Sequence, residues 1–264
     1  LAGVNELSSP DQTVWPSHET PGVNRGYQPD VLRKDRTLRT HTAACGPTID
    51  RSGLMGADYL GNAYVCEPAG NLVRRLILKD ENGIPRARNA YDKTEWLRST
   101  DERFRPVNTC MGPDGALYIA DMYRGVIQHK TYLTPYLKDQ IAQRGLDSPV
   151  AMGRIWRVRP RGLKGRRPET LSAAPDSTLV RILTVGPEGW WRDTAQRLLI
   201  ERRPADLRTM LGEAKNHPLS AGRAQVLWTL EATGQLRAED LRPIRSSAGA
   251  PGLAEAVARL CGVI

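Results

Sequence analysis

The spacing of apolar positions along the chain changes near Pro168. Upstream of this residue, apolar and polar positions tend to alternate between Gly- and Pro-containing turns, which is the pattern of β-strands. Downstream of it, Leu, Ala, Arg and Glu recur with the spacing of amphipathic helices. The sequence therefore predicts a β-rich part over residues 1–168 and a helical part over residues 169–264.

Short hairpins are predicted in the first part. The stretch "GNAYVCEPAGNLVRRLIL" indicates two strands around a Gly-containing turn, and "VNTCMGPDGALYIADMYRGVIQH" repeats this plan. In the second stretch Pro113, Asp114 and Gly115 supply the turn, because Pro presets φ, Asp bonds the local backbone and Gly tolerates a positive φ. "GRIWRVRP" is a third segment, although Ile155 and Val158 do not alternate strictly. The inward positions expected in the first stretch are Ala63, Val65, Leu72, Leu76 and Leu78.

Five or six helices joined by short loops are predicted in the second part. "GWWRDTAQRLLIERR" and "PLSAGRAQVLWTLEATG" each carry one apolar stripe, and Gly234 is a stop signal for the second. The other helical segments are "DSTLVRILTV", "PADLRTMLGEAKN", "AEDLRPIRSS" and "PGLAEAVARLCGVI". Trp190, Trp191 and Trp228 are expected in the core between stacked helical hairpins.

The expected fold class is β followed by α: terminal blades of a β-propeller, then a HEAT-like α-solenoid. Residues 1–168 would form the C-terminal part of the propeller, with an irregular N-terminal segment and a linker. Residues 169–264 would form the helical repeats. Closed propellers need about four to eight blades of four strands, and this chain provides two or three. We therefore expect the chain to be a fragment.

The formal charge of +9 raises the question of a nucleic-acid partner. Much of it is concentrated in "GRIWRVRPRGLKGRRPE", where Trp156 is the single aromatic residue for stacking. A solvated strand end and linker is the preferred interpretation. No window approaches the roughly 18 apolar residues of a membrane helix, and no secretion signal is visible in the first thirty residues.

Four cysteines are too few and too scattered for a disulfide scaffold: Cys45, Cys66, Cys110 and Cys261. No CxxC or CxxCH motif occurs, so the sequence predicts neither a zinc site nor a haem attachment site. A Cys45–Cys66 bridge across neighbouring strands and a pair of small buried thiols both remain open.

Candidate chemistry centres on a run of charged residues before the second hairpin. The four histidines are far apart, and no HExxH, GxSxG or Walker-type motif occurs. If Arg103 and Arg105 lie on one strand they project from the same face, and paired guanidinium groups clamp carboxylates. The alternative, which periodicity alone favours, is a solvated arginine pair bonded to Asp101 or Glu102. Asp121 would emerge at the end of the next strand.

A family resemblance rests on several of these motifs. "DERFRPVNTCMGPDGALYIADMYRGVIQH" resembles the last-blade signature of the soluble quinoprotein glucose and sorbosone dehydrogenases. A closer resemblance is to the large propeller-plus-HEAT membrane-bound dehydrogenases of planctomycetes and verrucomicrobia, which often carry a C-terminal cytochrome c domain. It is carried by "VWPSHETPGVNRGY", "HTAACGPTIDR", "FRPVNTCMGPDGALYIADMYRGVIQH", "YLTPYLKDQIAQRGLD", "GRIWRV" and "GWWRDTAQRLLIER".

This resemblance implies a dehydrogenase-like protein of the periplasm or cell envelope that oxidises a sugar or another alcohol. Arg103 and Arg105 match the arginines that hold pyrroloquinoline quinone, and calcium is a second implied cofactor. Asp121, Tyr123 and Arg124 would shape the rim of the site. The catalytic His would come from propeller blades that this chain lacks, and electrons would pass to the cytochrome c domain. The alternative function is a non-catalytic scaffold that binds a glycan or a partner protein.

Two positions depart from the sugar-dehydrogenase pattern. Those enzymes have a Lys before the Gly of the preceding hairpin, where this chain has Ala69 before Gly70. Pro106 replaces the usual Asp after the second arginine. His129, a few residues beyond the second hairpin, is expected at a blade edge and not as the catalytic base.

Overall fold

The computed structural model describes residues 11–81, 84–163, 170–186, 189–212 and 220–241. The chain divides into two compact units. Unit 1 comprises residues 1–112 and 116–165, and unit 2 comprises residues 113–115 and 166–264. The sequence places this division at residue 168.

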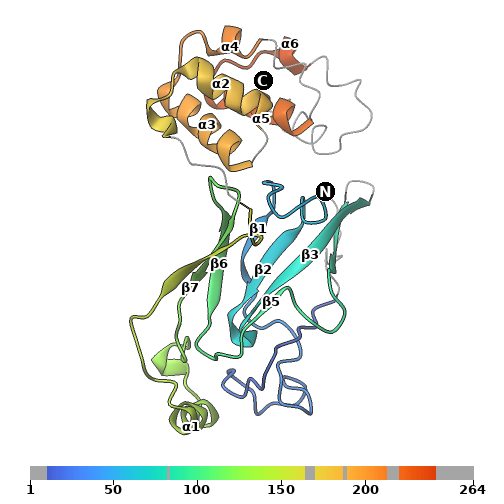
Figure 1. Ribbon diagram of the computed structural model, residues 1–264, viewed down its shortest axis with the longest axis vertical. Helices are drawn as coiled ribbons and strands as arrows, with labels where there is room; N and C mark the ends of the chain where they lie inside the picture. Colours follow the sequence, from blue (N-terminus) through green and yellow to red (C-terminus); the bar gives the residue numbers. More distant parts are fainter. Residues whose placement is uncertain (1–10, 82–83, 164–169, 187–188, 213–219, 242–264) are drawn as a thin grey trace. The chain divides into compact units, whose positions relative to one another are not determined.

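Unit 1 contains two antiparallel sheets (Figure 1). The first sheet has the order β1-β2-β3-β4, with β5 also pairing with β3, and the second has the order β6-β7-β8. The strands of the first sheet are β1 (Cys45–Ile49), β2 (Ala63–Glu67), β3 (Leu72–Glu81), β4 (Ile84–Asn89) and β5 (Leu97–Arg98). Those of the second sheet are β6 (Pro106–Met111), β7 (Leu117–Asp121) and β8 (Arg154–Val158).

The two predicted hairpins are confirmed as antiparallel pairs, β2 with β3 and β6 with β7. In the second hairpin Gly115 has φ +79°, as the Pro-Asp-Gly turn requires. The inward positions predicted for the first hairpin are wrong in part. The core cluster takes Tyr64, Cys66 and Val73, whereas Val65 is half-buried. Strict alternation fails here because β2 is an interior strand, buried on both faces.

A glycine allows the two sheets to approach each other. Gly46 of β1 has φ +54°, and a Cβ at this position would lie 2.4 Å from the Cα of Asn108 in β6. The Thr109 hydroxyl donates to the Gly46 carbonyl at 2.7 Å. The β1 and β6 backbones therefore pack directly against each other.

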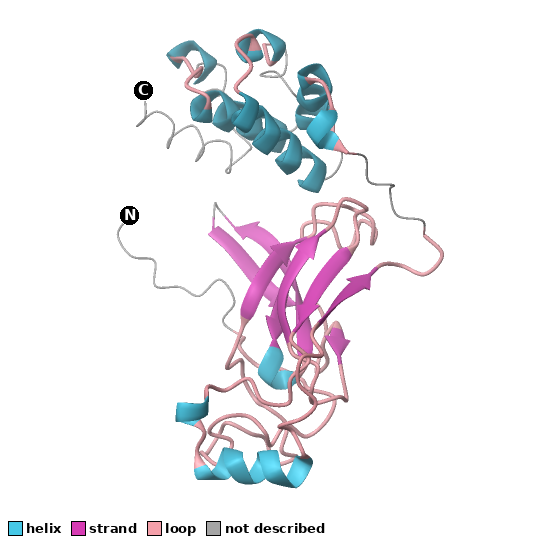
Figure 2. Ribbon diagram, turned by 90° about the vertical axis from the view of Figure 1, so that its left-hand side faces the viewer, coloured by secondary structure: helices cyan, strands magenta, loops and turns pink. Residues whose placement is uncertain are grey.

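Short helices of unit 1 stand among the loops beyond the strands (Figure 2). They are η1 (Pro68–Gly70), η2 (Lys130–Tyr132) and α1 (Pro135–Arg144). The side chain of Thr134 caps α1, Pro135 occupies its first turn, and Gly145 ends it in the left-handed conformation. His129 is exposed, and its ring accepts a hydrogen bond from the Thr131 N–H of η2 at 3.3 Å.

Unit 2 is helical. Its elements are η3 (Leu171–Ala173), α2 (Asp176–Val185), α3 (Gly189–Arg202), α4 (Leu207–Met210), α5 (Ser220–Ala232) and α6 (Ala238–Leu241). The predicted stripe of α3 is buried with residues of α2 and α5 in one core cluster that includes Trp191. Gly234 follows α5 with φ +72°, as its stop role predicts. The segment predicted as helical over residues 251–264 lies outside the described residues.

The described part of the chain is thus a mixed α/β structure with antiparallel sheets and six α-helices, and it forms no closed barrel. Within the same ranges, no helix is both long enough and apolar enough to cross a membrane.

Candidate functional site

The two arginines singled out in the sequence point to different places. They lie in the turn before β6 and not on a strand, because Asp101 Oδ1 accepts the Arg103 N–H and reverses the chain. Arg103 is half-buried, and its guanidinium donates to the carbonyls of Gly145 and Ser148, at 2.7 and 2.8 Å. The expectation that Arg103 and Arg105 project from one face of a strand is therefore wrong.

Arg105 is buried, with 5% of its surface exposed. Its guanidinium donates from Nε to the Arg124 carbonyl at 3.0 Å, from Nη1 to Pro68 O at 2.7 Å and from Nη2 to Gly125 O at 2.8 Å. A guanidinium has five N–H groups, so two are left without a partner among the described residues. Burial lowers the pKa of Arg105 to about 10, although nearby carboxylates oppose this shift. The group stays positively charged at neutral pH.

Asp121 fixes the backbone from which Arg105 extends. Its Oδ1 accepts the backbone N–H groups of Arg105 and Tyr123, both at 2.8 Å. Its Oδ2 accepts the indole N–H of Trp156 at 2.9 Å. With 3% of its surface exposed, Asp121 is a buried acceptor that joins β6, β7 and β8.

Tyr123 and Arg124 brace the loop that follows β7. Tyr123 has φ +44°, its hydroxyl donates to Asp101 Oδ2 at 2.8 Å, and the Arg154 guanidinium stacks 3.6 Å from its ring centroid. The hydrogen bond to Asp101 raises the pKa of the Tyr123 phenol. Arg124 contributes its carbonyl oxygen to Arg105.

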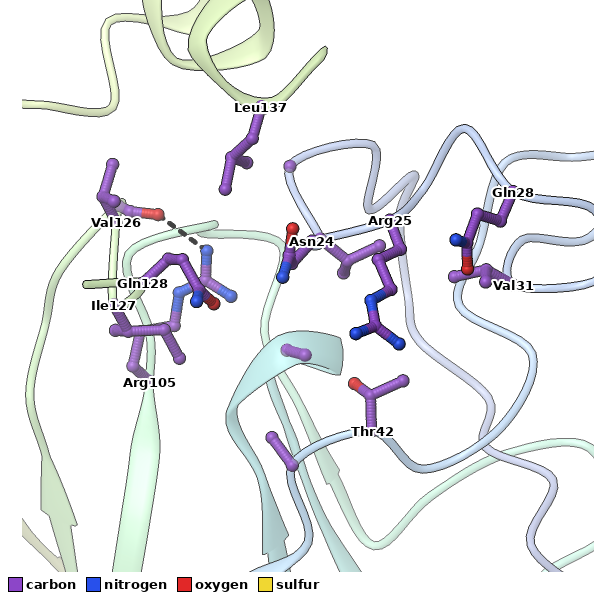
Figure 3. A pocket seen from close by; sticks show the side chains of 15 residues that line it. Asn24, Arg25, Gln28, Val31, Thr42, Arg105, Val126, Ile127, Gln128 and Leu137 are labelled. Atoms are coloured by element: carbon purple, nitrogen blue, oxygen red, sulfur yellow. Dashed lines mark hydrogen bonds between the residues drawn. The ribbon is translucent and has the colours of Figure 1, made fainter. Parts of the chain in front are cut away.

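One of the five predicted site residues, Arg105, lines a cavity of about 430 Å³, which we call the Arg105 cavity (Figure 3). Ligand pockets typically range from about 300 to 1,000 Å³, so its size suits a small molecule. The walls come from the segment 22–31, residues 42–43, Ala69, the segment 125–128 and Leu137 of α1. The polar side chains among them are Asn24, Arg25, Gln28, Thr42, Arg105 and Gln128.

Arg25 and Asn24 are the functional candidates that the sequence did not identify. Arg25 is an exposed cation, and within the described ranges its guanidinium makes no hydrogen bond or ion pair. The Oδ1 atom of Asn24 is buried, and no donor of the described residues reaches it. Figure 3 shows the Asn24 side chain between those of Arg25 and Arg105. These residues lie in "VWPSHETPGVNRGY", a stretch singled out only as part of the resemblance.

A buried carboxylate holds one wall of the cavity in place. Glu67, which is fully buried, accepts the backbone N–H groups of Thr42 and Ala43 from one oxygen, Oε2, both at 3.0 Å. The same oxygen lies 3.0 Å from His41 Nδ1. Thr42 and Ala43 are thereby fixed at the surface of the Arg105 cavity.

The chemistry of the lining is that of an anion-binding site. Among the described residues that line it, two carry guanidinium groups, none carries a carboxylate, and none is a His, Lys, Cys or Tyr that could act as an acid, base or nucleophile. Among the described residues, no group of three or more His, Cys, Asp or Glu lies together so as to hold a metal ion. The two guanidinium groups favour the binding and orientation of an acidic ligand.

Comparison with known proteins identifies a family. The family model described as a domain of unknown function (DUF7133) matches residues 4–162, more than half of the chain, which therefore belongs to this family. No curated protein and no solved structure matches the chain.

Proposed function

We propose that this DUF7133 family member binds a small carboxylate-bearing molecule in the Arg105 cavity. The observation that carries the proposal is the buried Arg105 guanidinium, which lines the cavity and has two N–H groups without a partner among the described residues. Guanidinium groups bind carboxylates through parallel, charge-assisted hydrogen bonds. Burial strengthens such bonds, because competing water is excluded.

The ligand also carries a hydrogen-bond donor beside its carboxylate. A buried acceptor without a partner costs about 1–3 kcal/mol. Asn24 lines the cavity, and its buried Oδ1 atom has no donor among the described residues. Once the Asn24 side chain turns toward the cavity, a hydroxyl or N–H group of the ligand would satisfy it. Arg25 would then bind a second acidic group at the exposed side. Hydroxy-dicarboxylates and acidic quinones both meet these requirements.

The resemblance to quinoprotein dehydrogenases favours an acidic quinone as the natural ligand. Ala69, which stands where those enzymes have a Lys, lines the same cavity as Arg105. The donor set fits the carboxylates of pyrroloquinoline quinone: Arg105 and Arg25 would hold them, with Asn24 and Gln128 as neighbouring amides. When bound, such a quinone accepts two electrons from an alcohol. The residues of this chain would orient it and shield one side from water.

In the wider proposal, unit 1 is the terminal part of a β-propeller and unit 2 a HEAT-like solenoid. The full protein would be an envelope dehydrogenase acting on a sugar or another alcohol, with a catalytic His from further blades and a cytochrome c domain as electron acceptor. Calcium is not assigned to the described residues, because the cavity lining offers no carboxylate ligand for it.

Calorimetric titration of the full chain tests the binding proposal. Tartrate supplies two carboxylates and two hydroxyls, and threitol is the matched neutral polyol with the same hydroxyls. We expect saturable binding of tartrate and of pyrroloquinoline quinone, and none of threitol. Equal binding of tartrate and threitol, or no binding of either acid, would contradict the proposal.

A second candidate, the non-catalytic scaffold, is favoured by two exposed apolar side chains on β8. Ile155 is 72% exposed and Trp156 is 43% exposed. Among the described strands β8 pairs only with β7, so its other edge has no described strand beside it and could take a partner strand. Substitution of Ile155 by Lys would abolish partner binding on the scaffold model without changing tartrate affinity.

A further inference from the structure

Two cysteines occupy directly opposed positions on neighbouring strands. Cys45 of β1 is the register partner of Cys66 of β2 in an antiparallel pair. Opposed residues in such pairs have Cα atoms about 4.5–5.5 Å apart, which falls within the 4.4–6.8 Å range of disulfide-bonded cysteines. Cys66 is a member of a buried core cluster, and Cys45 packs against it. Both side chains therefore lie on the same face of the sheet.

Both cysteines are free thiols, and they differ in accessibility. Cys45 is half-buried, while Cys66 is fully buried. Burial raises the pKa of both thiols, to about 12 for Cys66, where the neighbouring Cys45 and Glu67 add to the effect. Because Cys45 is the more exposed of the two, a small oxidant reaches it first. Exchange at neutral pH is slow, because the raised pKa values leave few thiolates.

Strand pairing on one side of the cysteines holds β1 and β2 in register. Pairing of Thr48 with Tyr64 and of Ile49 with Ala63 fixes the strands beyond the cysteines. A register irregularity between Cys45 and Thr48 leaves the Cys45 end less constrained than a regular ladder. Bond formation between the sulfurs can therefore proceed by a local adjustment of β1 that keeps the pairing of Thr48 and Ile49.

We propose that Cys45 and Cys66 are a thiol–disulfide exchange site that closes to a cross-strand disulfide. The co-reactant is a small-molecule or protein disulfide. The Cys45 thiolate attacks one of its sulfurs, which forms a mixed disulfide and releases the first thiolate. Cys66, on losing its proton, attacks the Cys45 sulfur and expels the second thiolate. Two thiols of this chain are oxidised, one disulfide is reduced to two thiols, and the two protons pass to the released thiolates.

The bond would act on a wall of the Arg105 cavity. Glu67 follows Cys66 in β2 and holds the backbone of Thr42 and Ala43, two residues that line the cavity just before Cys45. With the disulfide closed, Glu67 would hold one end of the segment 42–45 and Cys66 the other, so both ends would be attached to β2. The exchange site itself does not depend on which ligand the cavity binds.

Oxidation of the folded chain with oxidised glutathione tests the proposal. Free thiols are then blocked with N-ethylmaleimide, and the chain is digested with trypsin without reduction and analysed by mass spectrometry. We expect a disulfide between peptide 40–51, which carries Cys45, and peptide 52–74, which carries Cys66. The same oxidation in concentrated urea is the control, where pairs involving Cys110 should appear as well.

Two variants separate the steps. Cys66→Ser removes the second attacking thiol, so Cys45 should accumulate as a stable glutathione adduct. Cys110→Ser should leave the Cys45–Cys66 link unchanged, because this exposed residue of β6 is not its partner. If Cys66→Ser fails to fold, the peptide link in the unmodified chain still decides the question.

The linked form should resist urea better than the reduced form. The bond closes a loop of about 20 residues, which shifts the unfolding equilibrium on the order of a hundredfold toward the folded state. Wild-type Cys45 and Cys66 that both remain alkylated while Cys110 reacts would overturn the proposal. A linked form that is less stable than the reduced form would overturn the claim that the paired strands accept the bond with only a local adjustment.

Discussion

Substitution of Asp121 should both destabilise unit 1 and loosen the backbone that positions Arg105. Its carboxylate accepts three hydrogen bonds, from the backbone of Arg105 and Tyr123 and from the Trp156 indole. In Asp121→Asn one oxygen becomes an NH₂ group. At least one of the three donors then faces another donor, because an amide has a single acceptor oxygen.

The size of the effect follows from these three bonds. Hydrogen bonds to a charged group contribute about 1.5–3 kcal/mol each, and a buried donor left unpaired costs about 1–3 kcal/mol. Asp121→Asn should therefore lower the free energy of unfolding by about 2–4 kcal/mol, a large share of the 5–15 kcal/mol typical of a domain. Trp156→Phe alone should cost about 1–2 kcal/mol. In the double variant the amide NH₂ can point at the phenyl ring without meeting a donor.

A double-mutant cycle checks this reasoning, with urea unfolding of the four proteins followed by circular dichroism. We expect the double variant to be more stable than the sum of the single changes predicts, by about 1–2 kcal/mol. Independent sites add to within about 0.3–0.5 kcal/mol. Additivity within that margin would refute the claim that Asp121 and Trp156 share one buried hydrogen bond.

Two further predictions concern packing and pH. A Cβ on Gly125 would lie 2.2 Å from the Leu146 carbonyl oxygen, so Gly125→Ala should cost about 1–3 kcal/mol in thermal unfolding. The matched control Gly153→Ala meets only ordinary contacts, and equal stabilities of the two variants would contradict the close approach. Burial raises the pKa of Tyr64 above its ordinary value and that of Cys66 to about 12. Both groups therefore keep their protons in the folded state at pH values where the unfolded chain loses them. The contribution of these two groups to the free energy of unfolding is then present below about pH 9. It falls as the pH rises further, by at most about 1.4 kcal/mol per pH unit for each group. Urea midpoints that stay constant from pH 8 to 10.5 would exclude this.

The hairpins and most helices could be predicted because local chemistry specifies them. The Pro113-Asp114-Gly115 turn and the stop at Gly234 depend on backbone preferences that each residue carries with it. Helix α1 could have been found by the same means, since Thr134, Pro135 and Gly145 are its start and stop signals. Which residues of β2 point into the core cluster could not be predicted. Both sides of an interior strand are buried, so the alternation of apolar and polar positions carries no information there.

The candidate site was predictable only at Arg105. The spacing of two residues implied that Arg103 and Arg105 share a face, but Asp101 holds Arg103 in a turn that ends at Phe104, before Arg105. The second cavity arginine, Arg25, lies 80 residues away in an irregular segment, and no periodicity relates it to Arg105. Such juxtapositions arise from tertiary structure.

The central claim is that Arg25 and Arg105 hold an acidic ligand in one cavity. Its most direct test is the affinity of tartrate for Arg25→Gln, compared with Arg161→Gln, which removes an equal charge at an exposed residue outside the cavity. Loss of one charge-assisted contact is worth about 1.4 kcal/mol, so Arg25→Gln should weaken binding about tenfold. Arg161→Gln should leave the affinity within about twofold of wild type, since the charge it removes makes no contact with the ligand. Equal affinities of the two variants would contradict the assignment of the Arg105 cavity as the binding site.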